Sequence, residues 1–335
     1  MFDSRREPNT DCAAYPRWLG DIGGTNARFG WQTEPGGRID DVLVLPCAEF
    51  DSLADAGRTY LKRTGKAAPA CAAFGIANPV FGDAIAMTNH HWKFSVSELR
   101  DSLGLQRLVM VNDFAALALA LPTLPTDAVR QVGPGQRAPH AAIGILGPGT
   151  GMGVSGLLPI GHQNKWLPLS GEGGHVTLAA TNDWEFEVIS QLRQRYGHVS
   201  LERVVSGLGV VDLYHAICDL KGTGGREVVT AAQVLERANA EPGSSANDAL
   251  ELFCAFLGDA AGNLALTLGA RGGIFIGGGI VPRLGERFDQ SLFRARFEAK
   301  GRFKNYLAEI PTLVIESRVS PALYGASHAL DLGVW

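Results

Sequence analysis

The chain contains the same local pattern twice, and this repeat constrains its fold more than any other feature of the sequence. Each copy is an apolar strand, a glycine-rich turn and a second strand, over residues 18–31 and again over 143–154. A glycine turn lacks side-chain bulk, so its backbone N–H groups can close around an anion such as a phosphate. Tight turns alone would explain the glycines of either copy. The presence of both copies favours a domain duplication in which two loops grip one polyphosphate.

Composition and charge exclude several classes of protein. The 335 residues are 46% hydrophobic and 19% charged, as in a soluble globular protein with sizeable cores. The formal net charge of −4, without a Lys/Arg-rich block, argues against binding to nucleic acid or to an anionic membrane. No apolar run approaches the roughly 20 residues that span a bilayer. The five scattered cysteines lack paired metal-ligand spacing and indicate a cytoplasmic protein.

Further apolar patterns predict a mixed α/β protein with two domains. The segment 122–139, rich in proline and glycine, is the best boundary, and the last strand and helix can cross back to the first domain. We expect a flexible extension at 1–15, a small α/β domain at 16–122 completed by about 315–335, and a large α/β domain at 123–314. Beyond the hairpins, strands are expected at 41–45, 70–77, 108–111, 273–276 and 312–316, and helices at 52–64, 95–103, 183–196, 200–218, 230–240, 247–268 and 321–330.

Asn112 and Asp113 stand where an apolar strand passes into an Ala/Leu-rich helix. One of the two can simply cap that helix, which is worth ~1 kcal/mol. Alternatively, Asp113 acts as a general base, because a carboxylate at the carboxyl end of a strand faces the crevice where such sheets bind ligands. The local sequence leaves both interpretations open.

Three further polar side chains are candidates for chemistry. Glu172 and His175 lie on a segment that Gly173 and Gly174 make non-helical. This segment lacks the further ligands that a metal needs, but a carboxylate and an imidazole can hydrogen-bond sugar hydroxyls. A solvated turn is the alternative. Glu202 lies near the start of the predicted helix 200–218, where interaction with the helix dipole would also account for it.

A third glycine cluster, formed by Gly277, Gly278 and Gly279, follows the strand 273–276 and precedes a predicted helix start. A nucleotide commonly lies at such a turn, because the backbone there can approach flat groups and anions closely. None of the three clusters fits the dinucleotide fingerprint or the Walker lysine motif. A dehydrogenase and a P-loop enzyme are therefore disfavoured.

Taken together, these segments closely resemble the bacterial glucokinase family, the hexokinase-like kinases of the actin and sugar-kinase superfamily. The resemblance covers residues 18–330. Ser170 and Leu208 replace prolines that are common in the family, and neither substitution touches the expected chemistry. The resemblance implies two RNase-H-like (actin-like ATPase) domains, with glucose in an interdomain cleft. The motifs that carry it, in order, are residues 20–28, 87–92, 112–114, 147–153, 171–175, 202–207, 277–282 and 300–303.

The resemblance also implies roles for the matching residues, with ATP and Mg²⁺ as the expected nucleotide and metal. Asp113 would be the base on the sugar 6-hydroxyl, and Asp21 would order the water shell of the metal. The expected glucose contacts are Asn112, Asp113, Glu172, His175 and Glu202. The expected ATP contacts are Gly20, Asp21, Ile22, Gly23, Gly24, Thr25, Gly147, Gly149, Thr150, Gly151, Gly277, Gly278 and Gly279. A homodimer is expected, because family members are commonly dimeric.

Several alternatives remain within and beyond this family. The chain could phosphorylate another hexose, or use ADP or polyphosphate as the donor. It could also be a sugar-sensing regulator that binds without turnover, or an actin-like assembly protein. A regulator of DNA would need a helix-turn-helix appendage, which the short charged N-terminus cannot supply.

Overall fold

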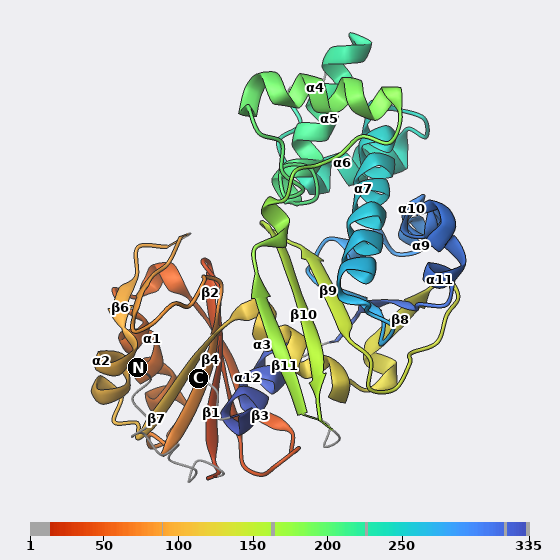
Figure 1. Ribbon diagram of the computed structural model, residues 1–335. Coiled ribbons are helices and arrows are strands. Elements are labelled where there is room, and N and C mark those ends of the chain that lie inside the picture. The colour runs from red at the N-terminus through yellow and green to blue at the C-terminus, as the bar shows by residue number, and fades with distance from the viewer. Residues whose placement is uncertain (1–13, 89, 162–164, 225–226, 318–319, 333–335) are drawn as a thin grey trace, which may run out of the picture. The chain divides into compact units, whose positions relative to one another are not determined.

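The protein is described by a computed structural model that covers residues 14–88, 90–161, 165–224, 227–317 and 320–332. Its internal contacts divide it into two compact units (Figure 1). The first unit comprises the chain up to Leu124, Ile160–Ser170 and the C-terminal part from Ser317 on, and the second comprises Pro125–Pro159 and Gly171–Glu316. This division differs from the expected domains in giving Ile160–Ser170 to the first unit. Most of the expected extension at 1–15 lies outside the described residues.

The first unit contains a five-stranded sheet with the order β3-β2-β1-β4-β7. The predicted first hairpin is confirmed, because β1 and β2 pair antiparallel with Gly20 opposite Phe29. β1 pairs parallel with β4, and β4 pairs parallel with β7. The strands are β1 (Arg17–Ile22), β2 (Asn26–Gln32), β3 (Ile39–Pro46), β4 (Cys71–Ile76) and β7 (Arg107–Asn112), and β5 (Ala84–Ala86) and β6 (Lys93–Ser95) form a separate pair.

The α-helices among the described residues of this unit are α1 (Leu53–Thr64), α2 (Val96–Ser102), α3 (Asp113–Ala120) and α12 (Pro321–Leu332). The predicted helices 52–64 and 95–103 are confirmed, and the side chains of Ser52 and Ser95 cap their first turns. Trp18 of β1 is fully buried and packs against Phe29, Tyr60 and Phe74. This aromatic cluster forms the core between α1 and the sheet.

The second unit is built around a six-stranded sheet with the order β11-β10-β9-β12-β13-β8. The predicted second hairpin is confirmed, because β9 and β10 pair antiparallel with Gly147 opposite Gly153. As in the first sheet, the first hairpin strand, β9, also pairs parallel with a later strand, β12. The strands are β8 (Val129–Val132), β9 (Ile143–Pro148), β10 (Met152–Ile160), β11 (Lys165–Gly171), β12 (Ile274–Ile276) and β13 (Thr312–Ile315).

The long helix α7 (Ser245–Leu268) forms the core of the second unit. It is the one helix of the described residues that could cross a membrane by length and composition, but 72% of its most apolar stretch is buried within the protein. This burial is what a core helix shows. The other helices of the unit are α4 (Asp183–Tyr196), α5 (Gly207–Lys221), α6 (Ala231–Ala240), α8 (Val281–Leu284), α9 (Glu286–Gln290), α10 (Phe293–Glu298) and α11 (Lys304–Ala308).

The predicted helix 200–218 was wrong in its first turns. α5 begins at Gly207, and the side chain of Ser206 accepts a hydrogen bond from the Gly209 N–H as its cap. The chain turns before this point and brings Gly209 close to Val204, where a Cβ at Gly209 would lie 2.5 Å from the Val204 carbonyl carbon. Glu202 therefore lies in a turn before the helix, and interaction with the dipole of α5 does not account for it.

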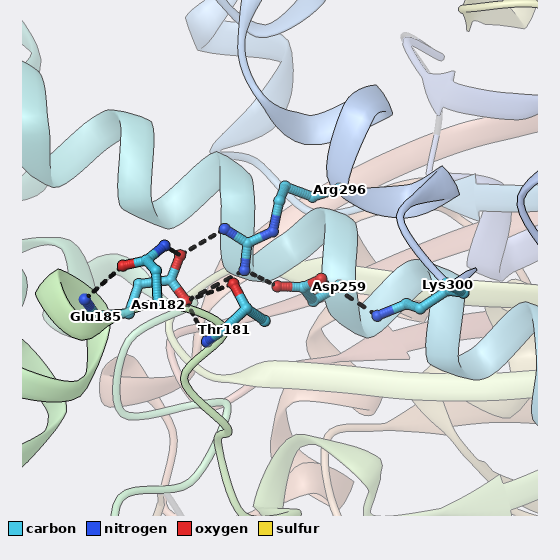
Figure 2. A network of polar contacts seen from close by, with 6 residues as sticks. All are labelled: Thr181, Asn182, Glu185, Asp259, Arg296 and Lys300. Carbon is cyan, nitrogen blue, oxygen red and sulfur yellow. Dashed lines mark hydrogen bonds and ion pairs between the residues drawn. The ribbon is translucent and has the colours of Figure 1, made fainter.

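A buried polar network joins α4, α7 and α10 (Figure 2). Arg296 of α10 donates to Glu185 of α4, whose side chain is 1% exposed, and to Asp259 of α7. Glu185 also accepts hydrogen bonds from the N–H and hydroxyl groups of Thr181, at 2.8 and 3.0 Å. Lys300 completes the network with a 3.2 Å contact to Asp259. The segment that follows His175 is thereby fastened to the helical core.

Candidate functional site

The first glycine loop joins β1 to β2 in the first unit. It is closed by a 2.9 Å hydrogen bond from the Gly23 N–H to the Asn26 carbonyl oxygen. Gly20 is buried, and a Cβ there would lie 2.5 Å from the Phe74 ring. Ile22 is also buried, whereas Gly23 and Gly24 are half-buried and Thr25 is exposed. Of the residues expected at the phosphates, the tip of the loop is therefore the part that a ligand can reach.

Asp21 points away from the Phe74 side of the sheet and is bound by two side chains. Its Oδ2 atom accepts from Arg28 and from the hydroxyl of Ser320, both at 2.7 Å. Asp21 is half-buried, so its carboxylate is oriented while still within reach of solvent. Ser320 immediately precedes α12, and sequence analysis gave no signal for this contact.

Asn112 and Asp113 lie where β7 meets α3, as expected. The Asn112 Oδ1 atom accepts from the backbone N–H groups of Phe114 and Ala115, at 3.0 and 3.1 Å. Its Nδ2 atom donates to the carbonyl oxygen of Asn78 at 3.4 Å. Asn112 is therefore the cap of α3, and Asp113 is the first residue of the helix. Asp113 contributes as well, because its Oδ1 atom also accepts from the Phe114 N–H, at 2.8 Å, whereas the Ala115 N–H donates to Asn112.

The second glycine loop, between β9 and β10, is held by several other segments of the second unit. The Gly149 carbonyl oxygen accepts from the N–H of Gly207 at the start of α5, at 2.8 Å. At the other end of the loop, the N–H of Met152 donates to the Glu202 carboxylate at 2.8 Å. A Cβ at Gly151 would lie 2.6 Å from the same carboxylate. Gly147 is buried, Gly149 and Gly151 are half-buried, and Thr150 is exposed.

Glu202 also links this loop to the segment that carries Glu172 and His175. Its backbone N–H donates to the Gly174 carbonyl oxygen at 2.8 Å. Gly174 packs so closely that a Cβ there would lie 2.1 Å from the carbonyl oxygen of Met152. Glu172 and His175 flank this contact and are exposed. The segment was expected to be non-helical, but Gly173–His175 forms one turn of 3-10 helix, which Glu172 precedes. The structure thus brings Glu172, His175 and Glu202 together beside the second glycine loop.

The third glycine cluster lies against the same loop. The Gly277 N–H donates to the Leu146 carbonyl oxygen at 2.7 Å, and a Cβ at Gly278 would lie 2.2 Å from the Pro148 carbonyl oxygen. Gly278 also adopts a φ of 78°, which favours glycine. Gly278 and Gly279 are exposed. The helix that follows, α8, has only four residues, so backbone approach explains these glycines better than a helix N-terminus does.

The candidate residues therefore form two groups, one in each unit. The first group is the loop 20–25 with Asn112 and Asp113, and the second is the loop 147–151 with Glu172, His175, Glu202 and the cluster 277–279. Sequence reasoning did not single out Asn78 and Ser320, which help to hold these groups in place, and it named Gly174 and Gly207 within motifs without this role. Each of them acts through a hydrogen bond or close approach between segments that are distant in sequence.

Known proteins match the chain along nearly its whole length. The family model described as Glucokinase matches residues 18–332. A glucokinase of Chromobacterium violaceum is 50% identical over 319 residues, which are 95% of this chain and 90% of the relative. The solved glucokinase of an Antarctic psychrotroph is 37% identical, with a TM-score of 0.85 over 94% of this chain and 98% of that one.

A more distant structure shares the fold alone. It is a ROK family glucokinase from Streptomyces griseus in complex with glucose and AMPPNP, 17% identical with a TM-score of 0.63, covering 94% of this chain and 99% of that one. These likenesses and the strand orders of the two sheets confirm the expected RNase-H-like fold of actin-like ATPases. The chain therefore belongs to the glucokinase family and is a glucose kinase.

Proposed function

We propose that Asp113 takes the proton of the glucose 6-hydroxyl while the γ-phosphoryl group of ATP moves to that oxygen. The observation that carries this assignment is that Asn112 caps the first turn of α3, which begins with Asp113. Asn112 accepts from the N–H groups of both Phe114 and Ala115, so capping does not depend on the additional bond from the Phe114 N–H to the Asp113 carboxylate. Asp113 is half-buried at the carboxyl end of β7, where ligands of such sheets bind. A carboxylate there can accept a proton during transfer.

Glucose is held through hydrogen bonds to its hydroxyl groups. We assign these contacts to Asn112 and Asp113 in the first unit and to Glu172, His175 and Glu202 in the second. The exposure of Glu172 and His175 supports the assignment, because side chains that bind a ligand must be reachable. A site of this kind penalises a sugar that lacks or misplaces a hydroxyl, since its polar groups are then left unpaired. Glucose is therefore preferred over galactose.

ATP lies against the glycine loops. At the reachable tips, Gly24, Thr25, Thr150 and Gly151 offer backbone N–H groups to the phosphates, whereas the N–H groups of Gly23 and Gly149 close their own loops. Gly278 and Gly279 lie beside the adenosine. Gly20, Ile22, Gly147 and Gly277 are buried and contribute by shaping the loops. Phosphoryl transfer depends mainly on alignment of the reactants and stabilisation of the phosphate charge. In this proposal the loops contribute to both and form no covalent bond to the phosphoryl group.

Mg²⁺ accompanies ATP in this proposal. Among the residues that the structure describes, no group of three or more His, Cys, Asp or Glu side chains could hold a metal. A single carboxylate is still enough for Mg²⁺, which commonly binds through substrate phosphates, water and one or two carboxylates. Asp21, held by Arg28 and Ser320, is the carboxylate that would order the metal's water. When bound, the ion neutralises charge on the phosphates.

Two further assignments follow from the family. We propose a cytoplasmic protein and a homodimer, as the resemblance to the bacterial glucokinase family implies. Light scattering coupled to gel filtration measures the oligomeric state. A mass of one chain across the working concentration range would remove the dimer from the proposal.

A coupled assay tests the proposed function directly. Purified protein with glucose, ATP and Mg²⁺ should form glucose 6-phosphate, and chelation of the metal should stop turnover. Replacing ATP by ADP or polyphosphate, and glucose by other hexoses, separates the rival kinases. Binding of glucose without turnover under every donor would instead indicate a sugar-sensing regulator.

A further inference from the structure

The first turn of α3, which begins with Asp113, is in contact with two glycines from other elements of the first unit. A Cβ at Gly325 of α12 would lie 1.6 Å from the carbonyl oxygen of Ala116 and 2.5 Å from its carbonyl carbon. A Cβ at Gly75 of β4 would lie 3.1 Å from the Ala116 Cβ and 3.6 Å from the Asp113 Cα. The turn that carries Asp113 thus packs against two glycines, at positions where a larger residue would collide with it or crowd it.

α12 is itself fixed to the sheet, so it cannot move away from α3 freely (Figure 1). The guanidinium of Arg17, on β1, is buried and donates to the carbonyl and hydroxyl oxygens of Ser327, both at 2.9 Å. The Ser327 hydroxyl in turn donates to Gln32 at 2.6 Å. A side chain added at position 325 would therefore displace α3 by on the order of 1 Å, since non-bonded atoms need more than 3 Å.

We propose that Gly325 and Gly75 are positioning residues for phosphoryl transfer, because their lack of a side chain sets where α3 places the Asp113 carboxylate. This inference rests on the proposed role of Asp113 as the base. Transfer between bound reactants depends steeply on geometry, and a misplacement of about 1 Å can cost ~100-fold in rate. The glycines therefore act on the rate of the chemical step more than on binding of ATP.

A purely structural role for these glycines predicts a different result, and the chain contains a matched control. Gly258 of α7 packs against α10 in the second unit, and a Cβ there would lie 2.3 Å from the Phe293 carbonyl oxygen. Gly258→Ala thus introduces the same kind of helix-to-backbone clash as Gly325→Ala. Neither α7 nor α10 carries a residue assigned to glucose or ATP.

The experiment compares kcat, the KM for ATP and the melting temperature of the full-length wild type and its variants. Gly325→Ala should lower kcat by ~100-fold while the KM for ATP changes little. Gly75→Ala should lower kcat less, because its contact at 3.1 Å needs only a small shift. Ala116→Gly removes the atom that this Cβ meets, so Gly75→Ala/Ala116→Gly should recover kcat. Gly258→Ala should lower the melting temperature and keep kcat.

A folded Gly325→Ala variant whose kcat stays within roughly 3-fold of wild type overturns the inference. So does an equal loss of kcat in Gly258→Ala. If Gly325→Ala does not fold, the Gly75 pair decides, and an undiminished kcat in Gly75→Ala or no recovery in the double variant overturns it. The Asp113→Asn variant distinguishes a failure of the proposed function from a failure of the positioning role. Near-normal kcat in that variant refutes the proposed function, whereas its loss beside an active Gly325→Ala refutes only the positioning role.

Discussion

The two glycine hairpins pair their strands alike, but their loops are supported differently. The first loop closes on itself through Gly23 and Asn26, with the Cys47 thiol donating to the Gly23 carbonyl oxygen at 3.4 Å. The second loop is contacted by Gly174, Glu202, Gly207 and Gly278, which come from three separate segments. A duplicated hairpin thus supplies two similar turns, and the chain inserted after the second one determines how tightly its loop is held.

This difference bears on how the two units tolerate change. In the first unit, the ion pair of the site joins Asp21 and Arg28, whose side chains are 20% and 36% exposed. In the second, the network of Arg296, Glu185 and Asp259 is almost wholly removed from solvent. Removing one partner of a solvent-exposed ion pair costs little folding stability, whereas removing one partner of a buried ion pair costs much, because the remaining charge is left buried without compensation. We therefore expect the loss of an ion-pair partner to destabilise the protein more when the pair lies in this network of the second unit than when it lies at the site of the first.

The largest expected effect is the loss of Arg296. Arg296→Met leaves the buried Glu185 and Asp259 carboxylates without their main partner, which should cost about 3–5 kcal/mol of unfolding free energy. Arg28→Met is the matched change in the first unit and should cost below ~1 kcal/mol. Urea unfolding measures both. Equal losses in the two variants would break the comparison between the units.

A smaller effect is expected from the loop glycines. Gly174→Ala places a Cβ 2.1 Å from the Met152 carbonyl oxygen, whereas the corresponding Cβ at Gly23 would lie 3.5 Å from the Asn26 carbonyl oxygen. Overpacking of this kind costs about 1–3 kcal/mol. Gly174→Ala should therefore lower the melting temperature clearly, and Gly23→Ala should leave it nearly unchanged. A reversed order would show that the second loop is not the more tightly packed.

The smallest effect concerns acid stability. Burial alone would raise the pKa of Glu185, but hydrogen bonds from Arg296 and Thr181 outweigh it and hold this pKa below its ordinary value of 4.5. The folded protein therefore binds fewer protons here than the unfolded chain. The resulting stabilisation is complete above pH 4.5 and is lost as the pH falls through the folded pKa. Urea unfolding between pH 7 and 3 should show a shallower acid loss for Glu185→Gln, and an identical profile would contradict this.

Much of the fold could be predicted from the sequence, because its signals are local. Alternating apolar residues around a glycine turn identified both hairpins, and Ser52 marked the start of α1 correctly. The start of α5 was missed, since the apolar pattern continues unbroken through 200–206. The turn there depends on the close packing of Gly209 on Val204, which no periodicity reveals.

The site was predictable to a lesser degree. The residue types at the ends of strands indicated Asn112, Asp113 and the glycine loops, but not what each one contacts. Glu202 binds the N–H of a residue 50 positions away, and Asp21 binds Ser320 at a separation of 299. Such contacts depend on tertiary structure and leave no mark on the neighbouring sequence.

The most direct test of the account is the activity of Asp113→Asn. This change keeps the shape of the side chain and leaves the Asn112 cap in place, but removes the proton acceptor. The account predicts a folded variant that still binds glucose, with kcat lower by at least ~100-fold, the lower end of what a general base contributes. A folded Asp113→Asn variant with near-normal kcat for glucose and ATP would contradict it.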